Sequence, residues 1–209
     1  MRILITGAAG FIGSHLAEAL VRSGHSVIGL DNFTPFYDPD LKTANAESLT
    51  CLGVAFHHLD LAHDDLGRVV AASDVIYHLA AQPGLSPHAP FESYLSNNVT
   101  ATQRLVTAAL GSDTPPMLIN IGTSSIYGAD VTGSEESEPR PTSYYGVTKL
   151  AAEQLVMAAG RTQGLRACSF RLFSVYGPRE RPDKLFPRLI RSVLHDTPFP
   201  LFEGSERHL

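Results

Sequence analysis

Three glycines, each separated from the next by two residues, follow the first apolar run of the chain. The run "RILIT" spans residues 2 to 6, and the segment "GAAGFIGSHLAEAL" then places Gly7, Gly10 and Gly13 at the start of a helical pattern. Positions without a side chain permit a tight turn and let backbone N–H groups approach a ligand closely. Because the N-terminal end of a helix attracts anions, a strand followed by this turn and a helix predicts a phosphate-binding loop.

An acidic residue closes the second predicted strand, in "HSVIGLD". Asp31 stands there, roughly twenty residues beyond the glycine loop, where the carboxylate of a dinucleotide-binding unit accepts hydrogen bonds from the adenosine ribose. Such a carboxylate also repels a 2′-phosphate, so the sequence predicts NAD rather than NADP as the cofactor. The alternative is a turn aspartate at a strand end. Asp60, which ends the third predicted strand, is a weaker candidate for a contact on the adenine side.

Short β-rich runs alternate with helical patterns along the rest of the chain. Strands are predicted at 2–6, 25–30, 54–59, 74–80, 116–122 and 166–173, and helices at about 12–23, 91–110, 144–160 and 184–195. This alternation predicts an α/β fold, a Rossmann-type doubly wound parallel sheet covered on both faces. The segment "HLAAQ" (78 to 82) ends the fourth strand with small residues, as a backbone passing close beside a cofactor requires.

Composition excludes several classes of partner. The 209 residues are 44% hydrophobic and 18% charged, which is typical of a globular protein, and the net charge of −5 gives no reason to expect a nucleic acid partner. No apolar run reaches the roughly 18 residues that cross a bilayer, so we expect no membrane partner and a cytoplasmic location. The two cysteines are too few for a disulfide framework, and no metal site is expected because adjacent histidines on a strand face opposite ways.

Two adjacent tyrosines and a lysine open the helical pattern in "YYGVTKLAAE". Residues four apart share one helical face, so Lys149 pairs with Tyr145 and not with Tyr144. A tyrosine has a pKa near 10, and a neighbouring ammonium together with an oxidised nicotinamide would lower it and make the phenol a usable base. Thr123, in "GTSSIYG" after the fifth strand, could bond the substrate oxygen whose proton Tyr145 takes. The alternatives are a surface Tyr–Lys pair and a turn threonine.

In this order and spacing, these motifs and "RLFSVYGPRERPD" resemble the extended short-chain dehydrogenase/reductases, in the branch of NAD-dependent nucleotide-sugar epimerases and dehydratases. The resemblance runs from residue 1 to about 190 and implies a catalytic triad of Thr123, Tyr145 and Lys149. It implies cofactor contacts from Gly7, Gly10, Phe11, Ile12, Gly13, Asp31, Asn32, Asp60, Leu61, Leu79, Ala80, Ala81, Gln82, Asn98, Tyr145 and Lys149. It implies substrate contacts from Pro83, Gly84, Thr123, Ser124, Ser125, Ser174 and Arg181.

The residues after the threonine narrow the reaction that the resemblance implies. Dehydratases of this branch usually carry an Asp-Glu pair there, whereas this chain has Ser124 and Ser125, and hydroxyls do not easily replace an acid and a base in an elimination. The pieces look closest to UDP-glucuronate 4-epimerases, which implies NAD-dependent interconversion of UDP-glucuronate and UDP-galacturonate through a transient 4-keto sugar. The alternatives are a UDP-glucose 4-epimerase, a uronate decarboxylase, a sugar dehydratase, and a noncatalytic NAD-binding module.

The resemblance also predicts how the chain is organised. We expect a NAD-binding Rossmann domain over residues 1–175 and the start of a truncated substrate-binding region over 176–209, with the C-terminal substrate domain largely missing. Family members are commonly homodimers through a four-helix bundle, which here implies the helices at 91–110 and 144–160.

Overall fold

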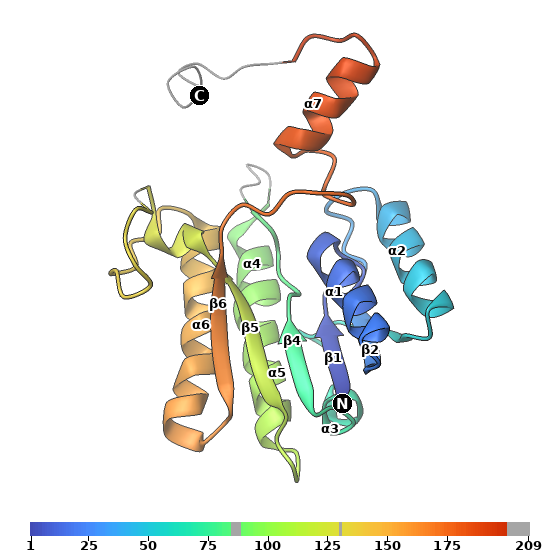
Figure 1. Cartoon of the computed structure of the whole chain (residues 1–209). Coiled ribbons are helices and arrows are strands. Elements are labelled where there is room, and N and C mark those ends of the chain that lie inside the picture. Colours follow the sequence, from blue (N-terminus) through green and yellow to red (C-terminus); the bar gives the residue numbers. More distant parts are fainter. Residues whose placement is uncertain (85–88, 130, 200–209) are drawn as a thin grey trace. The chain divides into compact units, whose positions relative to one another are not determined.

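A six-stranded parallel sheet organises the chain (Figure 1). Its strands are β1 (Arg2–Thr6), β2 (Ser26–Asp31), β3 (Ala55–His58), β4 (Val75–His78), β5 (Met117–Thr123) and β6 (Ala167–Leu172). They run in the order β3-β2-β1-β4-β5-β6, which is the strand order of a Rossmann fold, and each neighbouring pair is parallel. The predicted doubly wound parallel sheet is therefore confirmed.

The structure is a computed structural model, and it describes residues 1–84, 89–129 and 131–199. The chain divides into two compact units, Met1–Ser174 and Val175–Leu209. The sheet and its covering helices belong to the first unit, and helix α7 (Leu185–Leu194) belongs to the second. Within the described residues, no helix combines the length and the apolar character that a membrane span requires.

Each predicted helix is present. They are α1 (Phe11–Arg22), α6 (Tyr144–Gln163), α7, and a continuous run made of α4 (Phe91–Tyr94), a π-helix (Leu95–Thr100) and α5 (Ala101–Leu110). The sequence reading missed α2 (Pro39–Cys51), α3 (Gly67–Ala71) and a 3₁₀ turn (Ser124–Tyr127). Helix α2 has few apolar residues, so its periodicity is weak. Its sequence signal is an N-terminal cap: the Asp38 side chain accepts the Asp40 N–H, and a proline follows Asp38.

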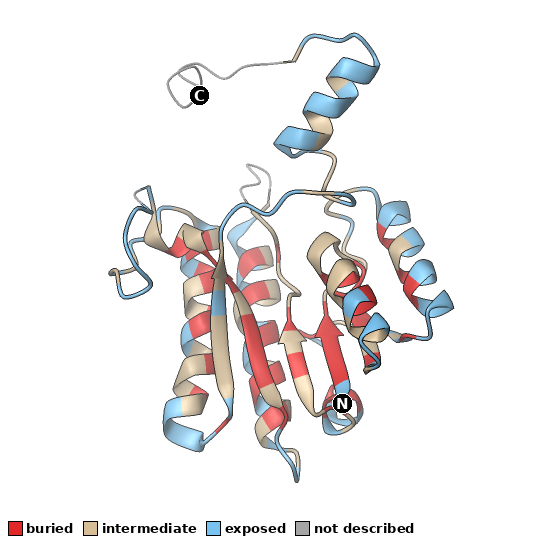
Figure 2. Ribbon diagram, in the orientation of Figure 1, coloured by how far each residue is buried: buried red, intermediate tan, exposed pale blue. Residues whose placement is uncertain are grey.

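Two hydrophobic layers cover the two faces of the sheet. Leu4 of β1 belongs to the layer formed with α3, α5 and α6, whereas Ile3 and Ile5 belong to the layer formed with α1 and α2. This alternation follows from the two-residue period of a strand, and it explains why β1 is apolar at successive positions. Figure 2 shows the buried residues concentrated in the central strands and in the helix faces turned toward them.

The carboxyl ends of the parallel strands meet at one edge of the sheet. Thr6 ends β1 and stands in register with His78, the last residue of β4, while Asp31 and Thr123 end β2 and β5. Ligands of open α/β sheets bind outside this edge, where the strand order reverses. The predicted cofactor and catalytic motifs therefore come from neighbouring strand ends.

Candidate active site

The glycine loop packs directly against the end of β4. Gly7 has a left-handed φ of 71°, and a side-chain carbon at this position would lie 2.8 Å from the backbone N of Ala80. A side-chain carbon at Gly13 would overlap the carbonyl oxygen of Gly7. Gly7 and Gly13 are thus required by close approaches of backbone to backbone, one to β4 and one across the turn itself.

The start of α1 is suited to an anion. Gly10 is the N-cap residue, and among the described residues no side chain caps this end and no acidic residue stands in the first turn. The first helical residues are Phe11, Ile12 and Gly13, whose backbone N–H groups have no partner within the helix. A twelve-residue helix with an uncapped, glycine-lined start fits the pyrophosphate of a dinucleotide.

Asp31 is buried at the end of β2, with an exposed fraction of 6%. Its carboxylate accepts the N–H of Ala9 at 3.1 Å and the N–H of Phe33 at 2.9 Å, so it is tied to the glycine loop on one side and to the following turn on the other. The Nζ of Lys42, from α2, lies 4.0 Å from the Asp31 carboxylate. The two N–H groups therefore fix the Asp31 carboxylate in place, and the Lys42 ammonium partly compensates its negative charge.

Asn32 and Asp60 come together from neighbouring strand ends. The Asn32 amide donates to the Asp60 carboxylate at 3.0 Å, and Asp60 also accepts the N–H of Ala62 at 2.7 Å. Both residues belong to the predicted cofactor set. In the structure, the Asp60 carboxylate also organises the turn after β3.

A directed chain of hydrogen bonds joins β1, β4 and the long helical run. The Ala80 N–H donates to the Thr6 hydroxyl at 3.2 Å, and the Thr6 hydroxyl lies 2.8 Å from Nδ1 of His78. On the other side of the ring, Nε2 of His78 lies 2.9 Å from the Thr102 hydroxyl, which itself donates to the Asn98 carbonyl at 2.6 Å. Thr102 has one proton, so the histidine must donate from Nε2 and accept at Nδ1.

His78 is therefore neutral in this arrangement. Burial lowers the pKa of the His78 imidazole to about 3, and the positive charge of Lys149 acts in the same direction. A neutral ring suits its position between two hydroxyl groups in the core, because a buried imidazolium would lack hydration. His78 acts as a structural link between the glycine-loop strand and the π-helix.

Asn98 lies within the π-helix and is 1% exposed. Its side-chain oxygen accepts the backbone N–H of Gln82 at 2.7 Å, and its Nδ2 donates to the Thr148 hydroxyl at 3.0 Å. Asn98 thus connects the segment after β4 to the helix that carries Tyr145 and Lys149. A π-turn inserts one extra residue into a helix, which is a frequent feature of functional sites.

The two adjacent tyrosines at the start of α6 have different environments. Tyr144 is 62% exposed and packs its ring on Phe91 at 5.1 Å between centroids, whereas Tyr145 is half-buried. Ser143 caps the helix by accepting the N–H of Gly146 at 3.1 Å. This cap fixes the helical phase, so that Tyr145 and Lys149 share one face of α6.

Lys149 is a buried ammonium, with an exposed fraction of 4%. Its Nζ donates to the carbonyl oxygen of Ile121 in β5 at 2.7 Å. Burial lowers the pKa of Lys149 to about 8, although the carboxylate of Glu153 acts in the opposite direction. A lysine held this way costs stability, and titratable groups with such shifts concentrate at functional sites.

Hydroxyl groups gather at the end of β5. Thr123 is buried, and its Oγ1 accepts the Ser125 N–H at 3.2 Å and lies 3.2 Å from the Ser125 hydroxyl. The 3₁₀ turn that begins at Ser124 packs against α6, where the Ser125 carbonyl approaches Gly146 closely. Thr123 and the two serines therefore lie beside the start of the helix that carries Tyr145.

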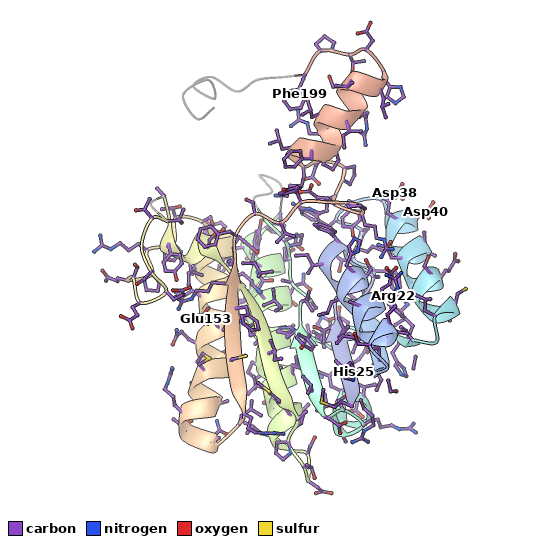
Figure 3. All side chains as sticks on the ribbon, in the orientation of Figure 1. Arg22, His25, Asp38, Asp40, Glu153 and Phe199 are labelled. Carbon is purple, nitrogen blue, oxygen red and sulfur yellow. The ribbon has the colours of Figure 1, made fainter. Side chains whose placement is uncertain are left out.

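A buried ion pair anchors the middle of α6, where Glu153 lies (Figure 3), to β6. Glu153, one turn after Lys149, is 2% exposed and accepts both Nε and Nη2 of Arg171, the shortest contact being 2.7 Å. Arg171 also donates to the Tyr127 hydroxyl at 2.5 Å. The pair thus links α6, β6 and the 3₁₀ turn after Thr123, and it raises the pKa of the Arg171 guanidinium.

The first unit contains the predicted site residues except one. The segment Leu79, Ala80, Ala81, Gln82, Pro83 and Gly84 follows β4, Leu61 follows β3, and Ser174 is exposed after β6. Arg181 belongs to the second unit, where it pairs with Asp183 at 3.5 Å. Sequence reasoning missed Lys42, Thr102, Glu153 and Arg171 as parts of the site. Only Glu153 had a sequence signal, because it follows Lys149 at helical spacing on the buried face.

The chain is similar to known proteins in sequence and in fold. Residues 3–208 match the NAD dependent epimerase/dehydratase family. The chain belongs to this family. It is 41% identical over 215 residues to YtcB, an uncharacterized UDP-glucose epimerase of Bacillus subtilis, covering 99% of the chain and 67% of the relative. It is 34% identical to UDP-glucuronate 4-epimerase 1 of Arabidopsis thaliana, covering 98% of the chain and 49% of that protein.

A crystal structure of a similar protein superimposes on the chain with a TM-score of 0.90. It is the UDP-glucuronic acid 4-epimerase of Bacillus cereus in complex with UDP-glucuronic acid and NAD, at 42% sequence identity, covering 98% of this chain and 66% of that one. The chain therefore spans about half to two thirds of the length of these family members.

Proposed function

We propose that the chain is the NAD-binding part of a nucleotide-sugar 4-epimerase that interconverts UDP-glucuronate and UDP-galacturonate. The observation that carries the proposal is the grouping of Tyr145, the buried Lys149 and the Thr123 hydroxyl where β5 meets α6. The family membership and the Bacillus cereus epimerase with NAD and UDP-glucuronic acid support it further.

In this proposal the glycine loop, Asp31 and Lys149 hold the dinucleotide. The uncapped start of α1 receives the pyrophosphate, and the Asp31 carboxylate accepts from the adenosine ribose. Asn32, Asp60 and the backbone after β4 line the rest of the site. When bound, NAD supplies a hydride acceptor that returns the hydride at the end of the cycle.

The chain's own side chains handle the proton. Tyr145 removes the proton of the sugar 4-hydroxyl, and Thr123 bonds the same oxygen. Lys149, with a pKa of about 8, favours the phenolate by its charge and is itself held by the carbonyl of Ile121. When the hydride returns to the other face of the 4-keto sugar, Tyr145 returns the proton and completes the epimerisation.

The serines after Thr123 account for the choice of a uronate. A 4-keto uronate is a β-keto acid, which loses carbon dioxide when its carboxylate bond aligns with the carbonyl π system. Oriented hydroxyl donors from Ser124, Ser125 and Ser174 would hold the carboxylate out of that alignment. The turn that fixes Ser125 against Thr123 supports this role.

The complete protein is proposed to be a cytoplasmic homodimer. An apolar strip of Phe91, Leu95, Tyr144 and Val147 is exposed on the run α4 to α5 and on α6, and the Phe91 and Tyr144 rings are in contact. A strip of this kind on adjacent helices is suited to a second copy of the same surface. A monomer in sedimentation equilibrium at micromolar concentration would exclude it.

The catalytic proposal is tested with the complete protein, UDP-glucuronate and NAD, followed by NMR. Tyr145→Phe should lower kcat by about a thousandfold while NAD affinity, measured by calorimetry, stays within about threefold, because only the proton transfer is removed. Tyr144→Phe is the matched control and should leave kcat unchanged. Full activity in Tyr145→Phe would remove the phenol from the mechanism, and release of carbon dioxide with a pentose product would instead indicate a decarboxylase.

A further inference from the structure

Lys42 is a buried cation beside the predicted ribose-binding carboxylate. It lies in the first turn of α2 with an exposed fraction of 8%, and its Nζ donates to the Thr34 carbonyl at 3.0 Å and lies 4.0 Å from Oδ1 of Asp31. The Tyr37 ring centroid is 5.2 Å from the same Nζ. Burying an ammonium costs hydration, and lysines are seldom buried without a partner.

The Asp31–Lys42 pair changes the usual argument for NAD. A lone carboxylate at the end of β2 excludes a 2′-phosphate by repulsion. Here the Asp31 carboxylate accepts two backbone N–H groups and also lies 4.0 Å from the Lys42 ammonium, so the net charge of the pair is zero. Net repulsion therefore cannot exclude a 2′-phosphate. Asp31 must exclude it by pairing with the Lys42 ammonium and by accepting hydrogen bonds from the ribose hydroxyls.

The two acidic residues that precede Lys42 are solvent-exposed, whereas Asp60 is half-buried and bonded to Asn32. Asp38 and Asp40 lie at the N-terminal end of α2 (Figure 3). Both side chains are exposed, so water and salt screen their charges. Lys42 lies on the inner side of the same helix and is screened much less. Helix α2 is itself tied to the glycine loop, because the Asn45 amide donates to the Ala9 carbonyl at 2.9 Å. The cation is therefore held at the adenosine end of the site.

We propose that Lys42 is a masked ligand for the 2′-phosphate of NADP, and that the Asp31–Lys42 pair sets the dinucleotide selectivity of this chain. In the natural protein Asp31 occupies the ammonium and favours NAD. Removing the charge of Asp31 frees the ammonium for a phosphate on the ribose, and removing Lys42 leaves the carboxylate uncompensated and strengthens the exclusion of NADP. The inference rests on the dinucleotide site of the proposed function.

The test is calorimetric titration of NAD and NADP into the complete protein freed of bound nucleotide. Asp31→Asn should bind NADP at least tenfold more tightly than the natural protein does, and Asp31→Asn combined with Lys42→Met should lose that gain. Lys42→Met alone should lower NADP affinity relative to NAD by threefold or more. Arg22→Met is the charge-matched control, because Arg22 is the last residue of α1 (Figure 3), roughly 16 Å along the helix from its first residue, and it should leave the ratio unchanged.

The outcomes separate the two proposals. A gain in NADP affinity that persists without Lys42, or an unchanged ratio in Lys42→Met, would overturn the inference while leaving NAD binding intact. A protein that binds neither dinucleotide would overturn the proposed function and this inference with it. If Asp31→Asn does not fold, as judged by circular dichroism, the Lys42→Met ratio decides by itself.

Discussion

The two halves of the carboxyl edge of the sheet are built by opposite means. At the β1–β2 end, the site is made of missing side chains: Gly7 and Gly13 let backbone approach backbone. At the β4–β5 end, it is made of buried polar side chains, with His78 and Lys149 held at lowered pKa values of about 3 and about 8. The first half depends on room for close backbone contacts. The second half depends on hydrogen bonds that offset the cost of burying charged and polar groups.

The two halves are therefore sensitive to different kinds of substitution. In the glycine loop, added volume is harmful, and no charged side chain stands between Gly7 and Gly13. In the polar half, the network from His78 to Thr102 and the pair of Glu153 and Arg171 must be complete, because a half-satisfied buried network is worse than none. Substitutions chosen with matched controls can test each side of the comparison.

The largest effect is expected from breaking the buried ion pair. Arg171→Met leaves Glu153 as an uncompensated buried charge and should lower the free energy of unfolding by about 3 kcal/mol. Arg140→Met is the control, because Arg140 pairs with Glu138 at the same 2.7 Å distance on the surface. It should leave the urea midpoint unchanged. Equal effects of the two variants would show that burial does not distinguish the pairs.

A smaller effect is expected in the glycine half. Gly7→Ala places a side chain on a left-handed backbone, and the added carbon would lie 2.8 Å from the backbone N of Ala80. It should lower the free energy of unfolding by about 2 kcal/mol more than Gly24→Ala does. Gly24 has a φ of 80° with nothing within 4 Å, so its substitution isolates the conformational strain. Urea unfolding of both variants gives the difference. If the two costs agree, the close approach to β4 contributes nothing.

The smallest effect has the opposite sign. Lys149→Met should raise the free energy of unfolding at pH 7 by about 1 to 2 kcal/mol. The lowered pKa of Lys149 corresponds to a penalty of about 3 kcal/mol for burying its charged ammonium, and the lost hydrogen bond to Ile121 offsets part of the gain. The folded pKa of about 8 lies below the ordinary 10.5. The penalty is thus complete below pH 8 and fades as the pH rises to 10.5.

The difference in melting temperature between Lys149→Met and the natural protein should therefore shrink and change sign across that alkaline range. A difference that stays constant from pH 7 to 10.5 would mean that Lys149 carries no burial penalty.

The sequence predicted the glycine half better than the polar half, for a physical reason. The glycine spacing, Asp31 and the helix start are signals within one strand–turn–helix segment. In contrast, His78 bonds Thr6 and Thr102, which are 72 and 24 residues away, and Glu153 meets Arg171 across 18 residues. Such pairs form only after the sheet order is set, and no local pattern encodes them.

Near the predicted cofactor site, helix α2 and Lys42 were missed for the same physical reason. Helix α2 has a weak apolar pattern, so neither the helix nor the contact of Lys42 with Asp31 was foreseen. The helix that carries both Tyr145 and Lys149 was foreseen, because its pattern is local. The Ser143 cap that sets its phase was not.

The contact of Gly7 with Ala80 has a consequence for the timing of maturation. During synthesis, the first strand, its turn and α1 leave the ribosome well before β4 does, at about 5 to 20 residues per second. Because the turn packs against Ala80, which also donates to Thr6, we expect it to reach its final shape when β4 docks. A nascent chain that ends before residue 80 should therefore not retain nucleotide, and the ability to do so should be acquired abruptly as β4 enters the sheet.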